Sequence, residues 1–120
     1  MAIKSVKIVV GVPETHADAV RKAMGDAGAG KIGDYSHCSF SAKGVGRFIP
    51  LDSAKPSIGE IGKLEEVPEE QIETVCLKKD LDKVIDAIKR VHPYEEIAIS
   101  IYPLAVDPED ITHNQYRRNK

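Results

Sequence analysis

The segment His92-Pro93-Tyr94-Glu95-Glu96 places an imidazole, a phenol and two carboxylates within five residues. Such groups bind metal ions, exchange protons or hold a polar ligand. Periodic apolar residues predict a helix over 80–91 and a strand over 97–104, and Pro93 stops the helix near His92. We therefore expect this polar segment at the junction of a helix and a strand, a common place for a binding site.

A divalent metal ion is one chemistry that these residues suit. His37, which we place at the start of the predicted second strand, adds a second imidazole, so the predicted metal ligands are His37, His92 and Glu96. The alternative is structural. Tyr94 and the Pro93 ring then pack as an apolar plug, His92 bonds a carbonyl at the helix end, and both glutamates face water.

Gly28, Gly30 and Gly33 spell G-x-G-x-x-G. In a dinucleotide-binding fold this pattern follows a strand and opens a helix, whereas here it follows a helix and opens a strand. It therefore predicts a helix cap and a tight turn. Glycine amides beside a lysine can still bind an anion, and a second Gly-x-x-Gly-Lys occupies 59–63. With the polar segment, the predicted ligand-binding residues are Gly30, Lys31, Gly59, Lys63, Tyr94 and Glu95.

The predicted elements follow the order strand, helix, strand, strand, helix, strand. Strands are expected over 6–12, 38–42, 72–77 and 97–104, helices over 14–27 and 80–91, and a turn over 43–46. This order predicts an α+β, ferredoxin-like βαββαβ fold with an antiparallel sheet and both helices on one face. The residues expected on the uncovered face, which another subunit would cover, are Val9, Ser39, Ser41, Ala98, Ser100 and Tyr102.

The length of 120 residues fits one domain over 1–104 and a tail over 105–120. Residues 50–68 are rich in Gly, Pro and charge, and predict an extended loop or hairpin with strand pieces around Ile58, Ile61 and Leu64. Cys38 and Cys76 lie in apolar alternating runs, so we expect two buried, reduced thiols.

The composition restricts the partners. No apolar run of about 20 residues is present, so we expect a cytoplasmic protein without a membrane partner. The net charge is −2, and the basic residues cluster only at Arg117, Arg118 and Lys120. We therefore expect no nucleic-acid partner.

Four segments together resemble a known family: Gly-Ala-Gly-Lys-Ile-Gly-Asp-Tyr-Ser-His-Cys-Ser-Phe at 28–40, Gly-Arg-Phe-Ile-Pro at 46–50, Ala-Lys-Pro-Ser-Ile-Gly at 54–59 and the 92–96 segment. They look like the CutA-like, PII-like inserted domain of the YqfO proteins, the long-form Nif-three-like family, of which this chain would be a stand-alone version. The resemblance implies a ferredoxin-like fold, a homotrimer, and a small-molecule or nucleotide ligand bound between subunits. The chain departs from the family pattern at Ile97, where the family has proline, so the last strand is expected to start early.

In the long proteins this domain is inserted between two halves that carry a dinuclear metal site. Those halves are absent from this sequence, so neither their metal ligands nor a hydrolase or cyclohydrolase activity is transferred. We expect a non-catalytic trimeric module that binds a small ligand or a divalent metal at subunit interfaces, with 50–68 buried near a neighbour's His92 loop. One alternative is a metal-dependent hydrolase-type enzyme that uses His37, His92 and Glu96. Another is a purely structural assembly domain.

Overall fold

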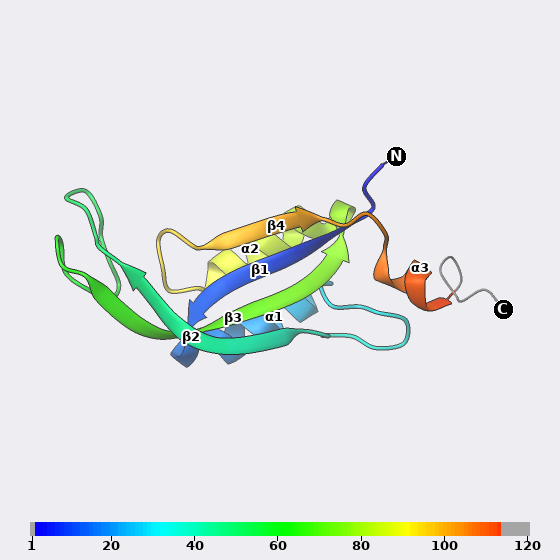
Figure 1. Cartoon of the computed structure of the whole chain (residues 1–120), viewed down its shortest axis with the longest axis horizontal. Helices are drawn as coiled ribbons and strands as arrows, with labels where there is room; N and C mark the ends of the chain where they lie inside the picture. The colour runs from blue at the N-terminus through cyan, green and yellow to red at the C-terminus, as the bar shows by residue number, and fades with distance from the viewer. Residues whose placement is uncertain (1, 114–120) are drawn as a thin grey trace.

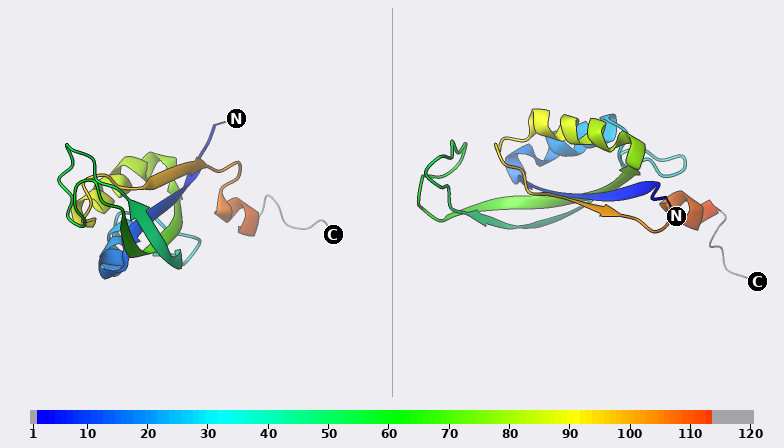
Figure 2. Two further views of the ribbon diagram at one scale, coloured as in Figure 1. Left: turned by 60° about the vertical axis from the view of Figure 1, so that its left-hand side comes forward. Right: turned by 90° about the horizontal axis from the view of Figure 1, so that it is seen from above.

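The structure, a computed structural model, describes residues 2–113 (Figure 1). The chain forms β1 (Ser5–Pro13), a 3₁₀ turn (Glu14–His16), α1 (Ala17–Asp26), β2 (Phe40–Phe48) and β3 (Glu65–Leu77). A second 3₁₀ turn (Lys78–Asp80), α2 (Leu81–Val91), β4 (Ile99–Pro103) and α3 (Pro108–His113) follow. The sheet order is β2-β3-β1-β4 with antiparallel neighbours. Both α1 and α2 lie on one face of the sheet (Figure 2). The predicted ferredoxin-like α+β fold is confirmed.

The core lies between the sheet and these two helices. Alternate residues of β1 point toward the helices, as the sequence pattern predicted, and β3 adds further apolar residues. Burial of these side chains is the main contribution to stability. The largest fully buried apolar side chains are Ile8, Val10, Val12, Val20, Met24, Ile72, Val84 and Ile88.

The β2–β3 hairpin is longer than the sequence pattern predicted. The expected turn over 43–46 is wrong: Gly44 pairs with Glu69 and Gly46 with Val67 inside a continuous ladder. Because β1 ends its pairing with β3 at Pro13, residues 45–48 and 65–68 continue beyond the sheet as a two-stranded arm. Residues 49–64, called the hairpin loop here, contain none of the expected strand pieces.

The uncovered face of the sheet also needs correction. Ser41 pairs with the buried Ile72 and accepts a hydrogen bond from Arg21 of α1 at 2.9 Å, so it lies on the helix-covered face. Phe40, one residue earlier, lies on the opposite face and is 66% exposed. Tyr102 of β4 is exposed as well. The uncovered face is therefore more aromatic than the sequence pattern predicted.

The last strand differs from the prediction, and the tail contains a short helix. β4 begins at Ile99 rather than at Ile97, so an early start is not observed. After β4, the chain forms the short helix α3, and the Ser5 hydroxyl donates a hydrogen bond to Asp107 just before it. Arg117, Arg118 and Lys120, the basic cluster of the sequence, lie outside the described residues.

Candidate functional site

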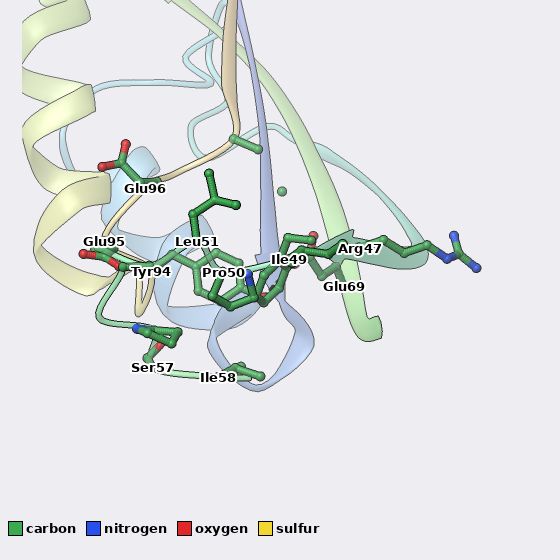
Figure 3. Close-up of a pocket in the computed structure, with 16 residues that line it drawn as sticks. Arg47, Ile49, Pro50, Leu51, Ser57, Ile58, Glu69, Tyr94, Glu95 and Glu96 are labelled. Atoms are coloured by element: carbon green, nitrogen blue, oxygen red, sulfur yellow. Dashed lines mark hydrogen bonds between the residues drawn. The ribbon is translucent and has the colours of Figure 1, made fainter. Parts of the chain in front are cut away.

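A pocket of about 470 Å³ lies where the hairpin arm, the hairpin loop and the segment after α2 meet (Figure 3). Its walls are mainly apolar, and the polar groups come from separate parts of the chain. This size and lining are typical of small-molecule sites. The principal lining residues are Arg47, Phe48, Ile49, Pro50, Leu51, Ser57, Ile58, Glu69, Tyr94, Glu95 and Glu96.

Tyr94 joins the two sides of the pocket. Its hydroxyl donates a hydrogen bond of 2.9 Å to Oε2 of Glu69 on β3, and its ring packs edge-on against Phe48 of β2 with 5.6 Å between centroids. Burial, reinforced by the bond to Glu69, raises the pKa of Tyr94 far above its ordinary value. The phenol therefore stays protonated and keeps donating to the carboxylate at neutral pH.

Glu69 has room in the pocket because two neighbouring strands carry glycine beside it. A Cβ on Gly46 would lie 2.5 Å from Oε1 of Glu69, and one on Gly11 would lie 3.2 Å from the same oxygen. A side chain at Gly46 would displace the carboxylate. Glycine at these two positions thus leaves space for the Glu69 carboxylate to approach the backbone, and it is not needed for an unusual backbone conformation.

His92 holds the start of this segment through both ring nitrogens. Nε2 lies 2.7 Å from the carbonyl oxygen of Gly11, and Nδ1 accepts a hydrogen bond of 3.1 Å from the Tyr94 amide. This pair of contacts requires a neutral ring with its proton on Nε2. Burial lowers the pKa of His92, which favours the same neutral form. His92 therefore resembles the structural alternative, except that the carbonyl belongs to β1 and not to a helix end.

Glu95 connects the segment after α2 to the hairpin loop. Its Oε1 accepts a hydrogen bond of 2.6 Å from the Lys55 amide. The hairpin loop therefore contacts the His92 segment of its own chain. Burial of residues 50–68 near a neighbour's His92 loop stays a prediction. Glu96 lines the same pocket and is exposed.

The three predicted metal ligands do not meet within one chain. His37 bonds Asp26 at the end of α1, with 3.0 Å between Nε2 and Oδ1, whereas His92 lies near His16, which precedes α1. A helix of ten residues separates these positions by about 15 Å. Among residues 2–113 no three His, Cys, Asp or Glu side chains are grouped as a metal ion would need. His37 also precedes β2 instead of starting it, with a left-handed φ of 59°.

The predicted ligand residues divide between two ends of the molecule. Tyr94 and Glu95 line the pocket, and Gly59 and Lys63 belong to the hairpin loop, where Lys63 pairs with Glu60 at 2.9 Å. Gly30 lies at the opposite end of β3, where its amide donates to the Val75 carbonyl at 2.7 Å. That amide is already occupied within the fold. Lys31 donates to the Gly33 carbonyl at 2.9 Å and lines a separate cavity of about 100 Å³.

Glu69, Phe48 and Gly46 are the site residues that sequence reasoning missed. They reach the pocket only through pairing between β2 and β3, which the expected turn over 43–46 concealed. One signal was present: Gly44 and Gly46 stand two residues apart, and glycine inside a strand commonly marks a close approach by another group.

The topology and the helix-covered sheet define the class of protein as a CutA/PII-like member of the ferredoxin-like α+β folds. CutA from Archaeoglobus fulgidus superposes with a TM-score of 0.62 at 17% identity, covering 86% of each chain. A GlnK–ATP complex from Bacillus subtilis gives 0.59 at 15% identity, covering 88% of this chain and 85% of GlnK. At such identity the similarity establishes the fold alone.

Other proteins are similar to the chain at much higher sequence identity, although no family model matches the chain. The GTP cyclohydrolase 1 type 2 homolog of Bacillus subtilis is 52% identical over 104 residues, which are 87% of this chain and 28% of that protein. The crystal structure of a Bacillus cereus protein related to NIF3 superposes with a TM-score of 0.76 at 49% identity, covering 88% of this chain and 27% of that one. Over most of its length the chain is therefore homologous to one segment of these NIF3-related proteins, and it spans about a quarter of their length.

None of the helices within residues 2–113 combines the length and the apolar character that crossing a membrane requires.

Proposed function

We propose that this domain is a non-catalytic module that binds a small molecule in the pocket beside Tyr94, and that it works as a homotrimer. The observation that carries the proposal is the pocket itself. Three separate segments, from β2, β3 and the chain after α2, converge on one cavity, and the Tyr94–Glu69 hydrogen bond fixes their relative positions. Polar groups on an otherwise apolar wall give a ligand its orientation.

We propose a binding role instead of an enzymatic one because of two groups at the pocket, His92 and Tyr94. His92 faces the Gly11 carbonyl and the Tyr94 amide, so neither ring nitrogen has a lone pair available as a base. Tyr94 has a raised pKa, which makes it a poor acid near neutrality. His92 and Tyr94 therefore do not form a general acid–base pair.

The trimer is proposed from the uncovered sheet face and from the family resemblance. Phe40 and Tyr102 leave large aromatic surface exposed on that face, and exposed apolar patches commonly mark interfaces. A cytoplasmic location fits such a module. Native mass spectrometry of protein purified without chelators or a His-tag tests the assembly and reads any bound mass in the same spectrum. A monomer at micromolar concentration would contradict the trimer.

Metal binding by His37, His92 and Glu96 is the second candidate, and it requires ligands from different subunits because one chain does not bring them together. The same mass spectrum tests it: about one metal ion per subunit, lost in His37→Ala, would support it. If metal is retained, the hydrolase-type alternative gains support and a substrate search follows. A trimer whose mass shows no bound metal or ligand, and which binds no small-molecule probe, would instead favour a purely structural assembly domain.

The ligand pocket itself is tested with Tyr94→Ala, which removes both the phenol and the aromatic wall. We expect it to abolish saturable binding of small aromatic probes, followed by chemical-shift changes of pocket amides. Tyr35→Ala is the matched control, because Tyr35 is exposed and lies outside the pocket lining. Equal loss of binding in both variants would argue against this pocket as the site.

A further inference from the structure

We propose that the ligand of this pocket is an organic cation: an ammonium or similar protonated nitrogen group attached to an apolar body, with Glu69 as its counter-ion. This inference rests on the proposed small-molecule function and specifies the chemical class of the ligand.

The described pocket is acidic. Three carboxylates line it, those of Glu69, Glu95 and Glu96, and Arg47 is the one cationic side chain among its lining residues. Arg47 is already paired, with Nε 2.9 Å from Oε2 of Glu66. In Figure 3 its guanidinium group points away from the other labelled residues. The local charge therefore favours a cationic ligand over an anionic one.

Glu69 is the carboxylate positioned to bind such a cation. It is half-buried, and Gly46 and Gly11 leave the space that its carboxylate occupies. The Tyr94 hydroxyl uses only one acceptor position, whereas a carboxylate offers about four. Glu69 can therefore accept further hydrogen bonds from a donor in the pocket. A charged N–H donor makes the strongest bond of this kind.

The aromatic walls match the same ligand class. Phe48 and Tyr94 pack edge-to-face at an interplanar angle of 67°, next to Glu69. Aromatic faces attract organic cations, and a neighbouring carboxylate adds to this attraction. The aliphatic residues Ile49, Pro50 and Leu51 offer contact surface for an apolar body.

A nucleotide fits this pocket poorly. A phosphate group would face the three carboxylates, and neither Lys31 nor Lys63, the lysines of the two glycine-rich segments, lines the cavity. Lys63 is paired with Glu60, and Lys31 lines the other cavity, to which Asp80 and Asp107 also contribute. The anion-binding features expected from the sequence are therefore not assembled around this pocket.

Three probes with nearly the same body test the charge directly: 2-phenylethylammonium, 2-phenylethanol and 3-phenylpropanoate. Each is titrated into uniformly ¹⁵N-labelled full-length protein, and dissociation constants are taken from amide shifts around Tyr94. We expect the ammonium probe to bind roughly tenfold or more tightly than the alcohol, because only the ammonium group carries a charge that pairs with Glu69. The carboxylate probe should bind more weakly than the alcohol.

Glu69→Gln assigns the effect to one residue, since the amide keeps the shape of the side chain and removes its charge. We expect the ammonium affinity to fall at least roughly tenfold, and the affinity for the uncharged alcohol to change far less. Glu73→Gln is the matched control on the same strand, since neither Glu73 nor its partner Lys7 lines the pocket, and it should leave both affinities unchanged. If Glu69→Gln fails to fold, Tyr94→Phe provides a milder variant that removes the hydrogen bond to Glu69.

The outcomes separate this inference from the proposed function. Equal affinities for all three probes, or tighter binding of the carboxylate, would overturn the cationic ligand and leave the pocket as a small-molecule site. Displacement of the ammonium probe by micromolar Mg²⁺ would also overturn it, because the carboxylates would then serve a metal ion. Failure of all three probes to saturate would count against both the cationic ligand and the pocket.

Discussion

The glycine-rich segment 28–33 and the polar segment 92–96 lie near opposite ends of β3. The polar groups at these two ends are used in opposite ways. At the Gly28–Gly33 end, the Gly30 amide donates to Val75, the Gly30 carbonyl accepts from Cys38, and Lys31 donates to Gly33. At the pocket end, the Glu69 carboxylate keeps acceptor positions that the fold does not use. The first end holds the chain together, and the second offers groups to a ligand.

This difference shows that residue types alone do not identify a site. Both ends combine glycine with charged and histidine side chains, and the glycine-rich motif at the first end has the more familiar pattern. What separates them is the set of partners that the fold supplies. A backbone amide bonded within the fold cannot also bind an anion without breaking that bond.

The largest effect should come from Gly30→Ala, at the structural end. Gly30 has a φ of 83°, and a Cβ there would lie 2.5 Å from the Cys38 carbonyl oxygen. The left-handed backbone and the clash with the main chain together should lower the free energy of unfolding by about 4 kcal/mol, measured by urea denaturation.

Gly62→Ala is the matched control for Gly30→Ala. Gly62 has a similar φ of 78°, but a Cβ there has nothing within 4 Å. Only the cost of the left-handed backbone conformation applies, so we expect the free energy of unfolding to fall by about 1 kcal/mol. Similar losses in both variants would mean that the 28–33 segment is not packed against Cys38 and that the two ends differ less than the structure indicates.

The sequence predicts the fold well because local periodicity and global topology agree. Val6 to Val12 alternate as a strand, and Ala17, Val20 and Met24 form one buried helical stripe. The β2–β3 hairpin was predicted less well. Gly44 and Gly46 indicate a turn by local preference, but pairing with β3 overrides that preference, because strand formation depends on neighbouring strands more than on intrinsic propensity.

The site could be predicted only in part for the same physical reason. Tyr94 and Glu95 were identified because they are adjacent in sequence to His92 and to the end of a helix. Glu69 and Phe48 come from strands whose register joins residues about 20 positions apart, which no local pattern reveals. The partners of His37 and His92 were equally unpredictable, and they place the two rings at opposite ends of α1.

An intermediate effect should appear at His92, which anchors the pocket segment. Burial lowers its pKa below the ordinary value of 6.5. Below that pH the unfolded chain binds a proton that the folded chain resists, so stability should fall as the pH is lowered through 6.5. His92→Gln should lower the free energy of unfolding by about 1–2 kcal/mol at pH 7.5. The variant should also lack the loss of stability that protonation of His92 causes as the pH falls.

Urea denaturation at pH 7.5 and 5.5 measures this difference. His113→Gln is the control, because His113 is exposed and should retain the wild-type pH dependence. A wild-type slope in His92→Gln would show that other groups cause the acid sensitivity, and that His92 is not held neutral by Gly11 and Tyr94.

The smallest effect on stability, and the sharpest test of the pocket end, is expected for Gly46→Ala. The new Cβ meets only the end of the flexible Glu69 side chain, which can rotate away, so the unfolding free energy should change by less than about 1 kcal/mol. The displaced carboxylate, however, loses its bond to Tyr94. Binding of 2-phenylethylammonium should therefore fall roughly tenfold while the protein stays folded.

Gly44→Ala, where a Cβ meets open space, should change neither property. If Gly46→Ala binds the probe like the wild type, the space that glycine leaves beside Glu69 does not serve a ligand, and the contrast between the two ends of β3 would rest on hydrogen bonding alone.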